Sequence, residues 1–177
     1  MNSSMKRFAI VLVVALFGAL AFTGCSTGGT SPDMEIDTVL FYRTGGDVDR
    51  TEVFFFKPDL TLERTLLLDS DTYAKEFLIQ MIEGSDNVEH LYISEEDWQS
   101  IVDLTKRVDF MTLPEEIDPP EGISDAPSYY ILIETTEGTH GAGGYAAGYG
   151  EDSINRRFGD LREGIENVID SSTTDPQ

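Results

Sequence analysis

Cysteine is almost missing from this sequence, and histidine and positive charge are scarce. The 177 residues include one Cys, two His, and 12 Lys and Arg against 33 Asp and Glu, a formal net charge of −21. One cysteine cannot form a disulfide within the chain, so a folded domain here must be held together by its core. A surface this acidic repels phosphate backbones, which argues against nucleic acid as a partner.

The two histidines, His90 and His140, stand in no pattern that binds a metal or activates a nucleophile. Neither belongs to an H-E-x-x-H sequence, and the chain contains no G-x-S-x-G motif. We interpret both as surface residues without a catalytic role. The sequence therefore predicts a protein that is not an enzyme and that has no metal site and no cofactor.

Two partial motif matches have simpler explanations. Asp69 and Asp71 begin like a calcium-binding loop, but Tyr73 stands where a third oxygen ligand belongs. Residues 141–146 (GAGGYA) match the G-x-G-x-x-A dinucleotide fingerprint, but the strand before them belongs to a predicted hairpin rather than to a βαβ unit. We therefore expect no nucleotide cofactor, and we interpret residues 141–150 as a glycine-relaxed strand followed by a mobile loop.

The N-terminus has the layout of an export signal. Lys6 and Arg7 precede an apolar run from Phe8 to Phe22, and small residues follow that run. At ~1.5 Å per residue the run would span about 22 Å as a helix, which is short of the roughly 30 Å hydrocarbon core of a bilayer. The pattern therefore favours a cleavable signal peptide, residues 1–24, over a permanent transmembrane helix.

The sequence Phe22-Thr23-Gly24-Cys25 resembles the lipobox of prokaryotic lipoproteins, in which an apolar residue, two small residues and a cysteine follow one another. The resemblance implies that the signal is cut after Gly24 and that Cys25 receives a thioether-linked diacylglycerol. The chain would then be anchored to the cell membrane or envelope on its extracytoplasmic face. An ordinary secretory signal with an unrelated cysteine is the alternative.

Two segments lack any apolar period and are rich in Gly, Ser, Thr and Pro. We expect residues 25–35 to be a flexible tether between lipid and domain, and residues 171–177 to be a disordered tail. Residues 36–170 between them are predicted to form a single domain.

Within that domain, extended segments alternate with two amphipathic helices. A helix over Ser94–Arg107 would begin with Ser94 as its N-cap, and a helix over Ser153–Ile169 carries the clearest apolar stripe. That stripe consists of Ile154, Phe158, Leu161, Ile165 and Val168. The predicted strands are residues 36–43, 51–57, 60–68, 129–135 and 139–147. Residues 69–90 fit a helix or a strand. The pattern predicts an α+β fold, a small antiparallel sheet packed by two amphipathic helices.

Four residues are candidates for contact with a partner. Tyr145 and Tyr149 lie in the glycine-rich segment, where a flexible backbone would display two aromatic side chains to a protein. Gly45 and Gly46 follow the first predicted strand and are candidates because of a family resemblance.

The segments YRTGG (42–46), VDFMTLPEEI (108–117) and YYILIET (129–135), followed by an amphipathic helix, occur in the order found in emfourin-like proteins. Those are small α+β inhibitors of thermolysin-type metalloproteases. The sequence resembles them in outline from residue 36 to residue 169, most specifically at Thr44-Gly45-Gly46 and Asp109–Pro114. The resemblance implies a protein-binding domain with Gly45 and Gly46 near its partner, a protease.

Alternatives stay open at two points. Asp109–Pro114 also has a structural account, in which Phe110, Met111 and Leu113 bury the exit of the helix and Pro114 ends it. For the whole chain, the first hypothesis is a membrane-anchored protein-binding domain that inhibits a protease. The second is a structural or accessory cell-envelope lipoprotein without inhibitory activity.

Overall fold

The computed structural model describes residues 34–46, 48–67 and 87–175. Its elements in chain order are the strands β1 (Ile36–Gly45), β2 (Val48–Phe56), β3 (Thr61–Leu67) and β4 (Glu89–Tyr92), helix α3 (Glu95–Arg107), the 3₁₀ turn η1 (Phe110–Thr112), strands β5 (Pro127–Thr135) and β6 (Gly138–Tyr145), and helix α4 (Ser153–Ser171).

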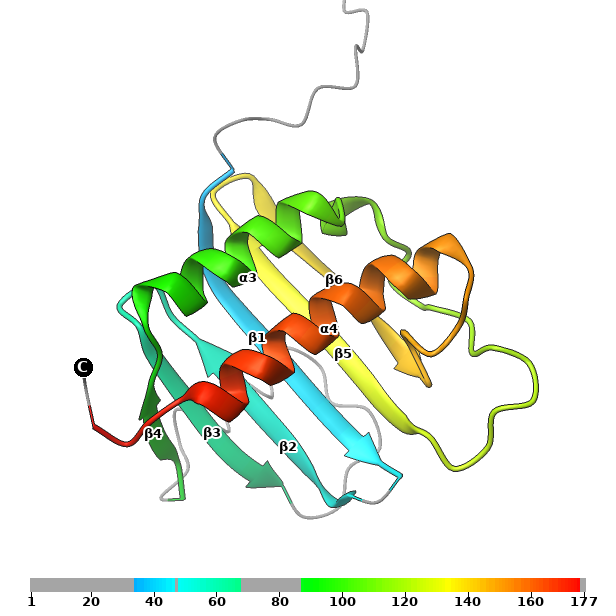
Figure 1. Ribbon diagram of the computed structural model, residues 1–177, viewed down its shortest axis with the longest axis horizontal. Coiled ribbons are helices and arrows are strands. Elements are labelled where there is room, and N and C mark those ends of the chain that lie inside the picture. The colour runs from blue at the N-terminus through cyan, green and yellow to red at the C-terminus, as the bar shows by residue number, and fades with distance from the viewer. Residues whose placement is uncertain (1–33, 47, 68–86, 176–177) are drawn as a thin grey trace, which may run out of the picture. The chain divides into compact units, whose positions relative to one another are not determined.

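The strands form one six-stranded antiparallel sheet in the order β4-β3-β2-β1-β5-β6. Figure 1 shows α3 and α4 next to each other across one face of this sheet. The protein is therefore α+β, as the alternation of extended and amphipathic segments predicted. The first and fourth predicted strands lie inside the sheet as β1 and β5, and β1 pairs with both β2 and β5.

Of residues 69–90, which fit either a helix or a strand, only the end has an assigned structure. Glu89 and His90 open the short strand β4, which pairs with β3. Residues 69–86 of that stretch, with Asp69 and Asp71, lie outside the described residues.

Both faces of the central strands are buried. Phe41 of β1 and Phe54 of β2 pack beneath the helices, whereas their chain neighbours Leu40 and Val53 belong to a smaller apolar cluster on the opposite face. Strands buried on both faces need apolar residues at successive positions, because neighbouring side chains point to opposite sides. This explains why β1 is predicted from a continuous apolar run rather than from alternation.

The two helices begin with side-chain caps. The hydroxyl of Ser94 accepts a hydrogen bond from the backbone N–H of Asp97, and the Asp97 carboxylate accepts one from the N–H of Ser94. This reciprocal capping box confirms the predicted start of α3. Asp152 caps α4 by accepting from the N–H groups of Ile154 and Asn155.

The apolar stripe of α4 faces the sheet, with one correction. Phe158, Leu161 and Ile165 are fully buried, but Ile154 is 38% exposed. Ile154 lies in the first turn of α4, immediately after the Asp152 cap. The periodicity is therefore correct along the helix and wrong at its first position.

Each edge strand of the sheet is shielded in part by an irregular segment. Gly143 of β6 exchanges hydrogen bonds with Glu115 and Ile117, and Tyr92 of β4 exchanges two backbone hydrogen bonds with Thr173, 2.8 and 3.0 Å long. An open strand edge is a template for aggregation, so these pairings protect the sheet. They also correct the expectation for residues 171–177, because the first residue of that tail ends α4 and Thr173 pairs with the sheet.

Candidate partner-binding surface

Three of the four predicted contact residues lie at one end of the sheet, around the start of β5. Gly45 pairs with Pro127, and Gly46 approaches the same proline so closely that a β-carbon there would lie 3.0 Å from Pro127 Cδ. The backbone N–H of Ala126 donates to the Tyr145 hydroxyl at 3.2 Å. The β1–β2 turn and the end of β6 are therefore neighbours, which the sequence alone did not indicate.

Tyr145 borders a hollow of about 280 Å³ on the sheet face opposite the helices. Tyr42 and Tyr130, paired across β1 and β5, form its aromatic wall, with ring centroids 5.5 Å apart and nearly parallel planes. Gly143 and Gly144 of β6 line its floor, and Glu115, Glu116, Ser128 and Tyr129 also border it. We call this hollow the tyrosine pocket.

Glycine in β6 is required by the way Tyr130 lies across that strand. A β-carbon on Gly141 would lie 2.3 Å from the Tyr130 hydroxyl oxygen, and one on Gly143 would lie 2.2 Å from the carbonyl oxygen of Tyr129. The predicted strand through these glycines is confirmed as β6, and each of the two marks a close approach of β5. With no side chains on this part of the strand, the aromatic ring can lie flat against the sheet.

The acidic side of the tyrosine pocket comes from the segment that pairs with β6. The N–H of Ile117 donates to the Gly143 carbonyl at 2.9 Å, which fixes the backbone beside Glu115 and Glu116. Both glutamates are exposed. Burial, and then the charge of Glu115, raises the pKa of Tyr130. The charge of a carboxylate therefore affects a tyrosine ring that forms the wall of the pocket.

Tyr149, the fourth predicted contact residue, lies on the other side of the sheet. It stacks on Tyr129 at 6.2 Å between ring centroids, and the guanidinium of Arg162 from α4 lies over both rings at 4.8 and 4.9 Å. Burial, together with the hydrogen bond to Tyr149, raises the pKa of Tyr129 to about 12. Tyr145 and Tyr149 therefore do not share a site.

The loop between β6 and α4 is held rather than loose. The N–H of Ala146 donates to the Pro127 carbonyl, and the N–H of Gly148 donates to the Asn155 side chain at 2.9 Å. Ala146 and Ala147 are fully buried. The expectation of a mobile loop over these residues is wrong, because short side chains here allow close packing against α4 rather than freedom.

A row of ion pairs on the helix side was missed by the sequence reasoning. Glu52 on β2 pairs with Arg43 on β1 and, at 2.7 Å, with Arg64 on β3. Burial alone would raise the pKa of Glu52, but the hydrogen bonds from Arg64 and Arg43 outweigh it and lower that pKa. These residues are distant in sequence or on different strands, so only the strand register could have brought them together.

The two histidines differ in their burial. His90 is exposed, as predicted, with 65% of its side chain accessible. His140 is partly buried: its Nε2 is 2.9 Å from the Leu113 carbonyl oxygen, and its ring meets Phe110 edge to face. Among the described residues, no three His, Cys, Asp or Glu side chains are placed to hold a metal ion.

Asp109–Pro114 has a clear structural role. Phe110 and Leu113 are buried and Met111 packs against the core, as the structural account predicted. Pro114 does not end the helix, because α3 already stops at Arg107 and Asp109 turns the chain with φ at 51°.

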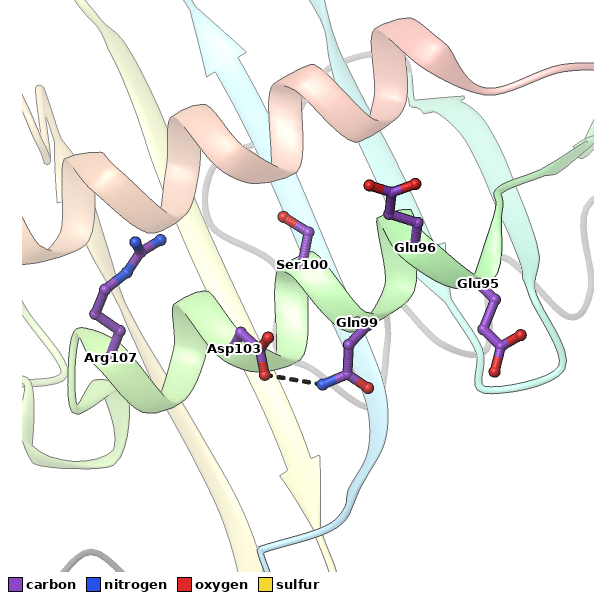
Figure 2. Close-up of a pocket in the computed structure, with 6 residues that line it drawn as sticks. All are labelled: Glu95, Glu96, Gln99, Ser100, Asp103 and Arg107. Carbon is purple, nitrogen blue, oxygen red and sulfur yellow. Dashed lines mark hydrogen bonds between the residues drawn. The ribbon is translucent and has the colours of Figure 1, made fainter.

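A second hollow, shown in Figure 2, runs along α3 and is lined by that helix alone. Its lining is polar throughout, including Glu95, Glu96 and Asp103, with a 2.8 Å hydrogen bond from Gln99 to Asp103. It offers no aromatic wall and no contribution from a second element. We regard it as the solvated face of an amphipathic helix.

The sequence matches no protein-family model and no curated protein. The resemblance to emfourin-like inhibitors therefore stays a prediction carried by its short motifs.

Gly24 and Cys25 lie outside the described residues, so signal cleavage and lipidation also stay predictions. Within the described part of the chain, no helix is both long and apolar enough to cross a membrane.

Proposed function

We propose that this chain is a membrane-anchored extracytoplasmic lipoprotein whose α+β domain binds another protein. The lipobox-like sequence that ends at Cys25 supports the anchor. The exposure of two tyrosines supports the binding function: among the described residues, Tyr145 and Tyr149 are the only exposed aromatic side chains, at 39% and 45%.

Exposed tyrosines on a fixed backbone are suited to protein recognition. A tyrosine supplies a large amphipathic contact area and has few rotatable bonds to immobilise. The backbone hydrogen bonds of the β6–α4 loop hold both residues in place before a partner arrives, which lowers the entropy cost of binding. Gly45 and Gly46 beside Tyr145 leave space for a partner to approach the end of the sheet.

A photo-crosslinking amino acid placed at residue 145 or 149 of the full chain, expressed in its native envelope, tests the proposal. We expect a discrete crosslinked protein from these positions and none from Ser100, which is equally exposed on α3. Crosslinks that are the same from all three positions, or absent from 145 and 149, would contradict a binding role for the tyrosines.

The anchor has its own test. Labelled fatty acid should be incorporated into the full chain and lost in Cys25→Ser. The variant should also move from the membrane fraction to the soluble fraction. Label that persists in Cys25→Ser would rule out Cys25 as the lipidated residue.

Protease inhibition is the specific version that the emfourin resemblance favours. It predicts that micromolar full-length protein slows a thermolysin-type protease without being cleaved, and that Gly46→Val weakens the effect. Unchanged protease activity would contradict the hypothesis of protease inhibition. A stable assembly with envelope components instead supports the alternative of a structural or accessory lipoprotein.

A further inference from the structure

We infer that the tyrosine pocket receives a lysine or arginine side chain presented by the partner protein. The inference rests on the proposed function, since it names the chemistry by which the domain would recognise its partner.

The walls of the pocket suit a cation. Tyr42, Tyr130 and Tyr145 place three phenol rings around one hollow, and aromatic faces attract ammonium and guanidinium groups. Tyr42 and Tyr130 are stacked side by side, which makes a continuous aromatic surface rather than an isolated ring. Such a surface also packs against the aliphatic stem of lysine or arginine.

The polar groups of the pocket carry negative charge. Glu115 and Glu116 line it, and among the described residues its lining contains no Lys, Arg or His. A basic side chain would pair with one of these carboxylates while its stem or head lies on the rings, whereas an anionic ligand would be repelled by both. The net charge of −21 adds a field that draws cationic surfaces toward the molecule.

The pocket is preorganised by the backbone. The hydrogen bonds between Gly143 and the segment of Glu115 and Ile117 fix the acidic side, and the Ala126 N–H fixes the Tyr145 hydroxyl. Glycine at 141 and 143 allows Tyr130 to lie flat. The floor, the wall and the acidic side are therefore held in position by separate contacts, none of which requires a ligand.

Short peptides test this chemistry directly. Acetyl-Gly-Arg-Gly-amide and acetyl-Gly-Lys-Gly-amide are titrated into the full chain in detergent micelles, and backbone amide NMR shifts are recorded. The matching citrulline peptide is a neutral control of nearly the same shape. We expect saturable binding of the two basic peptides, with shifts concentrated at Gly143, Gly144 and Tyr145, and no saturable binding of the citrulline peptide.

Two pairs of variants separate the pocket from the overall charge. Glu115→Gln with Glu116→Gln should weaken the arginine peptide about tenfold, equivalent to ~1.4 kcal/mol. Glu96→Gln with Glu137→Gln removes the same charge elsewhere and should change affinity less than twofold. Tyr145→Leu should weaken binding about fivefold because it removes an aromatic ring, and Tyr145→Phe should weaken it less because it keeps the ring and loses only the hydroxyl that accepts from Ala126.

Several results would overturn the inference. One is that the basic peptides show no saturable binding, and another is that the citrulline peptide binds as tightly as they do. A third is that the two glutamine pairs weaken binding of the arginine peptide equally, and a fourth is that tetramethylammonium binds more tightly than either basic peptide. If the peptides fail while crosslinking from residue 145 still captures a protein, the cation pocket is wrong and the protein-binding function stands. If both fail, the proposed function falls as well.

Discussion

The ring of Tyr130 lies over Gly141 so closely that a β-carbon on the glycine would be 2.3 Å from the phenol oxygen. The next glycine on the same face, Gly143, has its conflict with the carbonyl oxygen of Tyr129 instead. The two glycines therefore avoid different steric conflicts. Gly141 gives room to a side chain that can rotate, and Gly143 gives room to backbone that cannot move without breaking the β5–β6 pairing.

Alanine at these two positions should separate the two roles. We expect Gly143→Ala to lower the free energy of unfolding by about 3 kcal/mol, since overpacking against backbone has no easy relief. Gly141→Ala should cost about 1 kcal/mol, because Tyr130 can swing away, and it should disturb the tyrosine pocket. Urea denaturation measures both losses. Equal losses would contradict the distinction between a side-chain and a backbone conflict.

Glu52 should stabilise the sheet through its two arginine partners. At neutral pH, Glu52→Gln is expected to lower the free energy of unfolding by about 2 kcal/mol, because both charge-assisted hydrogen bonds weaken. Glu89→Gln is the control. The Glu89 carboxylate is 48% exposed and its ion pair with Arg64 is 3.3 Å long, so a loss below about 0.5 kcal/mol is expected.

The Glu52 effect should also depend on pH. Its folded-state pKa is lowered, so its contribution is present above about pH 4.5, the ordinary glutamate value, and is lost as the pH falls through the lower folded-state pKa. Wild type and Glu52→Gln should therefore converge in stability under acid conditions. Chemical denaturation between pH 2 and pH 7 follows this, and a constant difference would speak against the ion pairs.

The raised pKa of Tyr129 predicts that the protein loses stability in alkali. Its pKa is raised to about 12, so between about pH 10 and pH 12 the unfolded chain releases the phenol proton while the folded chain keeps it. Stability is full below pH 10 and falls across that window. Tyr129→Phe should reduce the fall without abolishing it, because the pKa values of Tyr42 and Tyr130 are raised too. Urea unfolding from pH 9 to pH 12 tests this, and an unchanged slope would contradict it.

Thr173 should protect the edge of β4 through its backbone. Thr173→Pro removes the N–H that donates to Tyr92, and we expect it to cost about 1 kcal/mol and to increase aggregation on heating. The preceding Ser172 already has ψ at 151°, a conformation that proline accepts in the residue before it. Thr173→Ala keeps the N–H and should be nearly neutral. Equal effects from the two substitutions would exclude the edge pairing as the reason.

Most of the fold could be predicted from local patterns in the sequence. Ser94 and Asp97 are three residues apart, so a capping box can be predicted without knowing the rest of the molecule. The same holds for Phe158, Leu161 and Ile165, whose spacing marks the buried side of one helix. Strands β1 and β5 were visible because strands buried on both faces need continuous apolar runs.

The site was only partly predictable. Tyr145 was found because an aromatic residue after a glycine run stands out, but Tyr42 and Tyr130 look like ordinary residues of apolar strands. One local signal could have led to them. Gly141 and Gly143 are two residues apart and so lie on the same face of a strand, which indicates that a large side chain from a neighbouring strand covers that face.

The sequence by itself determined the α+β class, both helices and the central strands, because each depends on residues close together in the chain, whereas the anchor at Cys25 stays a prediction from a local motif. The tertiary structure decided that Tyr42, Tyr130, Tyr145 and Glu115 share a pocket and that Tyr149 lies apart from them. Strand order and register set those distances, and a shift of one residue moves a side chain to the other face of the sheet. The pattern within one strand does not fix its register against its neighbours, so only the folded molecule shows which side chains meet in the tyrosine pocket.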